Sequence, residues 1–256
     1  MRTAVSIEGL KLRRSRVVLV ATVVLVGVLP SCAAGFMAAY LGGGDSQLTA
    51  KVSALVSGRT WADYLALIGQ LSAMGALLAV GVVVCWTYGR EFSDGTIIGL
   101  FALSVSRSCI AWAKGIVVLA WGFVASVLGV LVAVPLGLLL GLDPAGPGDI
   151  ARAAMMPVGV ATLTTMLALP LALVASIGRG YLAGVGALLG IVVVTQFVTT
   201  LGAGAWFPWA SPGLWSGLGG PALAAEVTAV HLMLPVLVGV LGLSLTALWW
   251  QRCEVA

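Results

Sequence analysis

The residues best suited to chemistry in this sequence lie in one short stretch, between Trp86 and Lys114. Charged residues make up only 9% of the 256-residue chain, yet five of them fall here: Arg90, Glu91, Asp94, Arg107 and Lys114. Carboxylates beside guanidinium and ammonium groups form ion pairs, either within a loop or with a partner. A charged loop between two long apolar runs therefore predicts a docking surface for a soluble protein.

The composition places those apolar runs in a membrane. Hydrophobic residues make up 61% of the chain, and the mean hydropathy is +1.13. A soluble domain carries about 45–50% apolar and about 25% charged residues. Because the runs are continuous rather than alternating, they are typical of membrane-spanning helices of about 20 residues.

The hydropathy pattern predicts an all-α polytopic membrane protein, formed by a single domain over residues 1–256. Six spans are expected, with Pro135, Pro157 and Pro170 interrupting the third and fourth: about Val17–Tyr40, Ala62–Cys85, Ile116–Leu140, Met155–Ile177, Tyr181–Thr200 and Thr228–Trp250.

The distribution of Lys and Arg predicts the orientation. With the N-terminus in the cytoplasm, 10 of the 13 basic residues fall on the cytoplasmic side and three fall outside. Basic residues concentrate in cytoplasmic loops, so both termini are expected on the cytoplasmic side of the membrane. The basic balance therefore follows from topology, and no nucleic-acid partner is expected.

Several other chemistries are disfavoured. The sequence has no GxxxxGK[ST] and no HExxH motif, and His231 is its single histidine, so neither a phosphate loop nor a zinc site is expected. Gly184 and Gly186 lie in an apolar helix, where packing through small residues is the better interpretation. A hydrolase using His231 with Ser176 or Ser211 has no local support. Arg13 to Cys32 imitates a lipoprotein signal, but the apolar run continues to Tyr40, which favours an uncleaved first span.

The charged loop can be divided by its helix signals. Gly95 ends the second helix, Thr96 can cap a short apolar segment from Ile97 to Leu103, and Ser104 or Ser106 can cap the third helix. A plain interfacial hairpin with anchoring charges is the alternative interpretation.

The stretch GREFSDGTIIGLFALSVSRSCIAWAK resembles the cytoplasmic loop of type-2 ATP-binding-cassette permeases, a family of six-span bacterial exporters. Glu91, Gly95-Thr96, Ser106-Arg107 and Lys114 occupy the family's motif positions, although Ser104 stands where proline is usual. Glu8 to Ser15 is similar to the family's N-terminal amphipathic segment, which lies against the membrane.

The resemblance implies that two permease chains pair and bind two separate ATPase subunits, with membrane lipids around them. ATP and Mg²⁺ would belong to the ATPase, and this chain would have no cofactor or catalytic residue. The loop would act as a coupling helix, with these ATPase-coupling residues: Arg90, Glu91, Phe92, Asp94, Gly95, Thr96, Ile98, Phe101 and Arg107. Glu91 is expected to pair with Arg90 or Arg107, or with a basic residue of the ATPase.

Two further sets of residues complete the prediction. The few polar residues within the spans are expected to face protein or a cavity. The resemblance implies that the second and fifth spans line the cavity, which suggests a substrate cavity at Gln70, Thr195, Gln196 and Thr199, although the glutamines could merely pack. The segment between spans five and six is aromatic and proline-rich, which is typical of an interfacial belt. The resemblance implies instead an external gate of short helices there, at Trp206, Pro208, Trp209 and Pro212. No charge lies deep in the spans, so an amphipathic or apolar cargo such as a drug, peptide antibiotic or lipid-like molecule is favoured. A non-transporting membrane immunity or assembly protein is the alternative from another class.

Overall fold

The computed structural model describes residues 1–43, 47–101 and 105–253, and the structured part of these ranges is all-α. Six helical segments are long and apolar enough to span a membrane, which confirms the predicted fold class. They comprise, in chain order, α2, η1 and α3 together (Arg16–Leu41), α5 (Trp61–Ser93), α7 (Arg107–Leu139), α8 with α9 (Pro147–Ile177), α10 (Tyr181–Thr200) and α13 (Ala229–Arg252).

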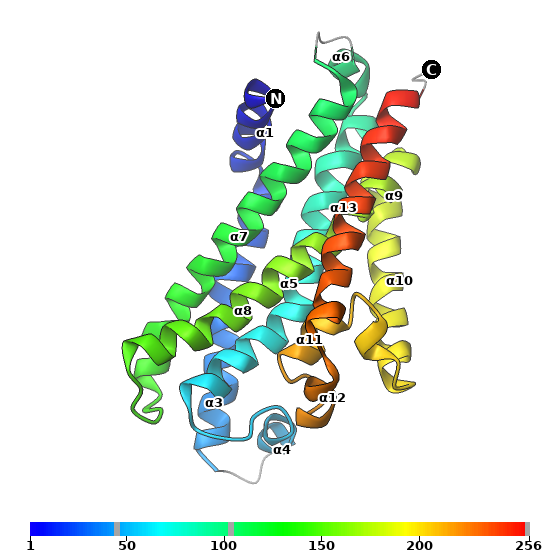
Figure 1. Ribbon diagram of the computed structural model, residues 1–256. Helices are drawn as coiled ribbons and strands as arrows, with labels where there is room; N and C mark the ends of the chain where they lie inside the picture. Colours follow the sequence, from blue (N-terminus) through cyan, green and yellow to red (C-terminus); the bar gives the residue numbers. More distant parts are fainter. Residues whose placement is uncertain (44–46, 102–104, 254–256) are drawn as a thin grey trace.

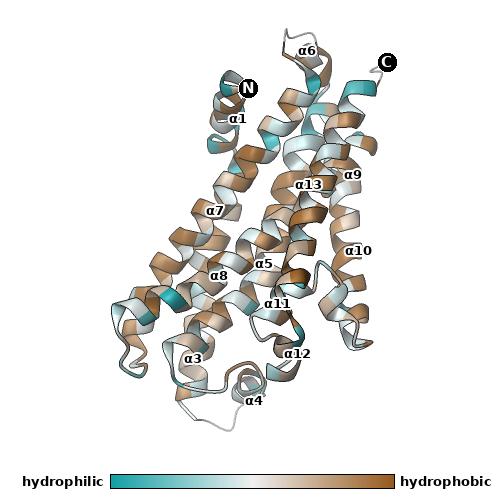
Figure 2. Ribbon diagram, in the orientation of Figure 1, coloured by the Kyte–Doolittle hydropathy of each residue, from teal (hydrophilic) through white to brown (hydrophobic). Residues whose placement is uncertain are grey.

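Short helices gather at both ends of the bundle (Figure 1). One end, here called the N/C end, carries both termini, α1 (Arg2–Arg13) and α6 (Ile97–Phe101). The opposite end carries α4, η2, α11 and α12 (Gln47–Ser53, Gly204–Trp206, Ser211–Trp215 and Pro221–Glu226). Hydrophobic residues dominate the length of the spans, and hydrophilic residues concentrate toward the two ends (Figure 2).

Helix α5 is the central element of the bundle. Within its most apolar stretch 61% of residues are buried inside the protein, compared with 11% for α10. Its glycines allow close packing: a Cβ on Gly81 would lie 2.8 Å from the methyl groups of Leu188, and one on Gly69 would lie 3.0 Å from Cβ of Ser216. Helix α5 is therefore packed inside the bundle, whereas α10 lies at its periphery.

The helices differ from the predicted spans mainly in length. Helices α5 and α7 each run 33 residues, well beyond the ~20 that cross the hydrocarbon. Pro135 and Pro157 lie inside intact helices, whereas Pro170 separates α8 (Pro147–Ala168) from α9 (Leu171–Ile177). Proline is tolerated within membrane helices where neighbouring groups satisfy the freed carbonyls.

The first span contains a π-helical turn. The segment η1 (Val24–Val28) separates α2 (Arg16–Val23) from α3 (Leu29–Leu41), and the N–H of Leu29 donates to the carbonyl of Val24, five residues earlier. Pro30 follows directly and has no N–H to donate, so the wider turn lets the helix continue past it. The first span therefore runs through Cys32 to Leu41 without a break.

Candidate functional site

The main site at the N/C end is a buried cluster of four charged side chains from three helices. Glu8 and Lys11 come from α1, Glu91 from the last turn of α5, and Lys114 from α7. The side chains of Glu8, Glu91 and Lys114 are 5%, 3% and 1% exposed. The side chain of Lys11 lies at the edge of the cluster and is 33% exposed. The cluster therefore ties α1 to the two long helices that flank α6.

The distances form a closed network. The Lys114 ammonium lies 2.8 Å from Glu91 Oε1 and 2.8 Å from Glu8 Oε2. The Lys11 ammonium lies 3.1 Å from Glu8 Oε1 and 3.1 Å from Glu91 Oε1. The second oxygen of Glu91 accepts a hydrogen bond of 2.6 Å from the Thr96 hydroxyl. Every carboxylate oxygen of the cluster is thus engaged.

Two acids and two bases make the cluster neutral, which explains how it is tolerated. Removing one member of a buried ion pair leaves an uncompensated charge and costs about 3–5 kcal/mol. Burial opposes the charge of Lys11, but the carboxylates of Glu8 and Glu91 outweigh burial and raise the pKa of Lys11 above its usual value. Lys11 therefore stays charged at any physiological pH.

The structure corrects the expected surroundings of Glu91. From the sequence, its carboxylate is expected to pair with Arg90, with Arg107 or with a basic residue of the ATPase. Instead Glu91 is buried and pairs with Lys114 and Lys11. The reason is that α1 packs its Ala4, Glu8 and Leu12 face against the bundle and so covers this point. The sequence does contain a signal for this contact. Ala4, Glu8 and Leu12 are spaced four residues apart, so Glu8 lies on the same helix face as two apolar residues that are buried.

The remaining predicted coupling residues fall into two groups. Asp94, Gly95 and Ile98 are exposed, Ile98 by 63%, and Gly95 has a φ of +68° that suits the sharp turn into α6. Thr96 is exposed and donates hydrogen bonds to the carboxylate and backbone carbonyl of Glu91. Phe101 ends α6, and its side chain lies outside the described residues.

The second group contacts the bundle. The Arg90 guanidinium stacks 4.4 Å from the ring centroid of Trp86. Phe92 packs against Trp249 and Trp250 of α13, with ring centroids 5.8 and 6.2 Å apart. Arg107 donates to the carbonyl of Cys253 at 2.9 Å. As predicted, Ser106 caps α7 by accepting from the N–H of Cys109, whereas Ser104 lies outside the described residues.

Three of the four predicted cavity residues share a groove. Thr195, Gln196 and Thr199 of α10 line a groove of about 280 Å³ together with Met74 and Leu77 of α5 and with the α11 region. Thr195 and Thr199 donate to carbonyls four residues back in their own helix, at 2.7 and 2.8 Å. The amide of Gln196 is therefore the most adaptable polar group on this wall.

Gln70 lies elsewhere. It is 5% exposed, and its amide nitrogen donates to the carbonyls of Leu55 and Ser216, both at 3.2 Å. These bonds attach the segment before α5 and the turn after α11 to α5. The structure thus does not bring Gln70 together with Gln196, and it gives Gln70 a packing role.

The segment between α10 and α13 forms the predicted short helices, η2, α11 and α12. Trp209 donates to the carbonyl of Leu167 at 3.1 Å, and Pro212 is buried at the start of α11. Trp206 is 66% exposed and stacks edge-on against His231 at 4.5 Å between centroids. Pro208 accepts a hydrogen bond from Ser211 through its carbonyl. The segment covers the opposite end of the groove-forming helices.

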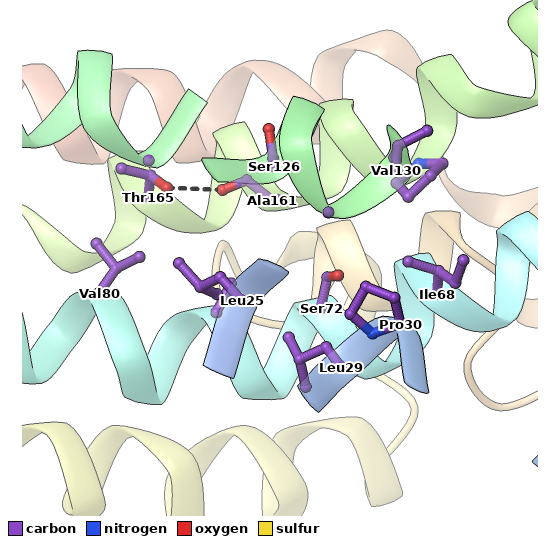
Figure 3. Close-up of a pocket in the computed structure, with 14 residues that line it drawn as sticks. Leu25, Leu29, Pro30, Ile68, Ser72, Val80, Ser126, Val130, Ala161 and Thr165 are labelled. Carbon is purple, nitrogen blue, oxygen red and sulfur yellow. Dashed lines mark hydrogen bonds between the residues drawn. The ribbon is translucent and has the colours of Figure 1, made fainter. Parts of the chain in front are cut away.

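A narrow internal cavity of about 20 Å³ lies between the first span, α5, α7 and α8 (Figure 3). Its walls carry the hydroxyls of Ser72, Ser126 and Thr165 among apolar side chains, and Thr165 donates to the carbonyl of Ala161. The volume is enough for about one water. It is therefore a packing gap between the helices.

The family model described as "ABC-2 family transporter protein" matches residues 4–199 of this chain. The chain belongs to this family. The match spans α1 to nearly the end of α10, so it contains the whole charge cluster, α6 and the α10 wall of the groove. No curated protein matches the chain. The protein is thus a multi-pass membrane permease of an ATP-binding-cassette transporter, a family in which the permease is typically a non-catalytic subunit that works with an ATPase.

Proposed function

We propose that this permease exports an amphipathic or apolar substrate from a bacterial cytoplasm, driven by ATP hydrolysis in a separate cytoplasmic subunit. The observation that carries the proposal is the placement of α6. This short helix presents the exposed Ile98 beyond the spans, and Thr96 at its base is bonded to Glu91 of the charge cluster, which joins three helices.

The cluster supports a specific route of coupling. An ATPase that displaces α6 also moves Thr96, whose hydroxyl is bound to Glu91. Glu91 in turn holds Lys114 of α7 and Lys11 of α1. A displacement at α6 thereby biases the packing of α1, α5 and α7 together. Differential contacts of this kind are what an ATPase needs to shift a two-state bundle.

The charge distribution supports an orientation with the N/C end in the cytoplasm. Ten of the 13 basic residues lie at or near that end, in α1, in connecting segments or in the terminal turns of spans, against three at the opposite end. Basic residues favour the cytoplasmic side of a membrane. In this orientation α6 faces the compartment that contains ATP.

The groove between α5, α10 and α11 supports the class of cargo. Its walls are mostly apolar, with Gln196 as the polar group available for selection. Helix α10 also exposes an apolar face that includes Val193, Val194 and Phe197. A second permease chain against that face would enclose the groove as part of a shared substrate cavity.

A photoreactive amino acid at position 98 tests the proposal. In membranes of the native host, light should attach an ATP-binding-cassette ATPase to the permease. The same amino acid at position 201, where Leu201 is 82% exposed at the other end of α10, should not capture it. If position 98 captures no ATPase and none co-purifies, the proposal is wrong and a non-transporting immunity or assembly role is favoured.

A further inference from the structure

Two apolar grooves run along the outside of the first span, starting at its N/C end. Groove A, of about 640 Å³, lies between the first span and α7 and is lined by Val18, Val23, Val26, Gly27 and Val117 among others. Groove B, of about 580 Å³, lies between α2 and α5 and is lined by Val17, Val20, Val24, Leu78 and Val82 among others. Neither groove is shared with the charge cluster or with the α10 groove.

Each groove has an arginine at its N/C end. Arg13, the last residue of α1, lines groove A, and Arg16, the first residue of α2, lines groove B. Both side chains are exposed. Among the described residues, no carboxylate lies within 4.0 Å of either guanidinium.

The charge cluster explains why these arginines keep their positive charge uncompensated. Glu8, which shares α1 with Arg13, and Glu91, which contacts α1 through Lys11, are both paired with Lys11 and Lys114. The junction between α1 and α2 thus presents Arg13 and Arg16, one at each groove, as a cationic site. Guanidinium groups bind phosphate with paired hydrogen bonds, better than an ammonium group does.

The length of the grooves matches one leaflet of a bilayer. Groove A extends from Arg13 to Gly27, and the helical part from Arg16 to Gly27 rises about 16 Å. Half of a hydrocarbon core is about 15 Å. The polar atoms inside groove A are satisfied within the protein, since Trp121 donates to the Thr22 hydroxyl at 3.0 Å and Thr22 donates to the carbonyl of Val18. Such walls suit acyl chains.

We propose that grooves A and B are binding sites for anionic phospholipids of the leaflet at the N/C end. In each groove the arginine binds the lipid phosphate and the apolar wall seats the acyl chains. A neutral zwitterionic lipid fits the walls equally well but gains less from the cationic junction, so the site selects by headgroup charge. The proposal requires only that the spans cross a bilayer, and it is independent of cargo and of the ATPase.

Native mass spectrometry of the delipidated full-length chain tests this directly. We expect phosphatidylglycerol to fill two sites, and phosphatidylcholine with the same acyl chains to bind each at least fivefold more weakly. Arg13→Gln should weaken one site and Arg16→Gln the other, each about fivefold, which corresponds to ~1 kcal/mol for one basic residue near a membrane surface. The double variant should weaken both.

Matched variants separate groove binding from general charge and from folding. Arg14→Gln removes the same charge from a residue that lines neither groove, so it should change either site by less than twofold. Gly27→Phe places a ring in groove A, where a Cβ meets no atom within 4 Å, and should abolish one site. Gly35→Phe, equally open but outside both grooves, should abolish none. Equal binding of the two lipids, or unchanged binding in Arg13→Gln/Arg16→Gln and in Gly27→Phe, would overturn the proposal.

Discussion

The two ends of the bundle are fastened by different chemistry. At the N/C end, α1, α5 and α7 are joined by four charged side chains, three of them buried, whose ammonium–carboxylate distances are 2.8 to 3.1 Å. At the opposite end, α5 is joined to its neighbouring segments by neutral hydrogen bonds, chiefly from the Gln70 amide. Displacement of one neutral hydrogen bond changes stability little, whereas displacement of one member of a buried ionic network disturbs all of its contacts. The N/C end is therefore the end suited to transmit a displacement of α6.

The largest effect is expected from Lys114→Met. The substitution keeps the aliphatic stem but leaves Glu8 and Glu91 together with only Lys11 to balance them. Free energy of unfolding in detergent micelles should fall by about 3–5 kcal/mol. Lys51→Met, at an exposed position of the opposite end, provides the control and should change it by less than about 0.5 kcal/mol. Equal stability of the two variants would show that the cluster does not hold the N/C end.

Gln70→Leu should have a smaller effect at the opposite end. The carbonyls of Leu55 and Ser216 lose their amide donor, which costs about 1–3 kcal/mol. Part of this is offset because the Oε1 atom of Gln70, buried without a partner among the described residues, also disappears. Protease sensitivity of the segment before α5 and of the α11 region should increase. Unaltered cleavage at both places would show that contacts other than those of Gln70 hold these segments against α5.

Thr96→Val tests the link between α6 and the charge cluster at the N/C end. The change removes only the hydroxyl that links the start of α6 to Glu91. Unfolding free energy should fall by about 1 kcal/mol, with faster amide hydrogen exchange in residues 97–100. Thr96→Ser retains the hydroxyl and should behave as the wild type. Identical hydrogen exchange in the valine and serine variants would show that the stability of α6 does not depend on the cluster.

Gln196→Leu should affect stability least. The groove that Gln196 lines is open and mostly apolar, so unfolding should shift by less than about 0.5 kcal/mol. Resistance of the host to toxic amphipathic compounds should nevertheless change in range. A resistance profile that matches the wild type for every compound would make Gln196 a packing residue.

Local patterns were sufficient for the elements but not for their contacts. Six spans, the break at Gly95 and the cap at Ser106 follow from hydropathy and from residue preferences over a few positions. The charge cluster joins residues 106, 80 and 23 positions apart, so it depends on how α1, α5 and α7 are rotated against one another. The same reason separates Gln70 from Gln196: both are amides within spans, and only the packing shows that one fastens loops while the other faces a groove.

The central claim is that the charge cluster holds α6 in the position in which the ATPase binds. The direct test is the Kd of the purified ATPase subunit for wild-type permease and for Glu91→Ala in the same detergent. Glu91→Ala removes the Lys114, Lys11 and Thr96 contacts together. Without these contacts α6 should occupy its binding position for only a fraction of the time, and a fraction of about one tenth weakens the apparent Kd about tenfold. Asp94→Ala, which truncates an exposed carboxylate three residues later, should change Kd by less than about threefold. Equal Kd values for wild type and Glu91→Ala would contradict the account.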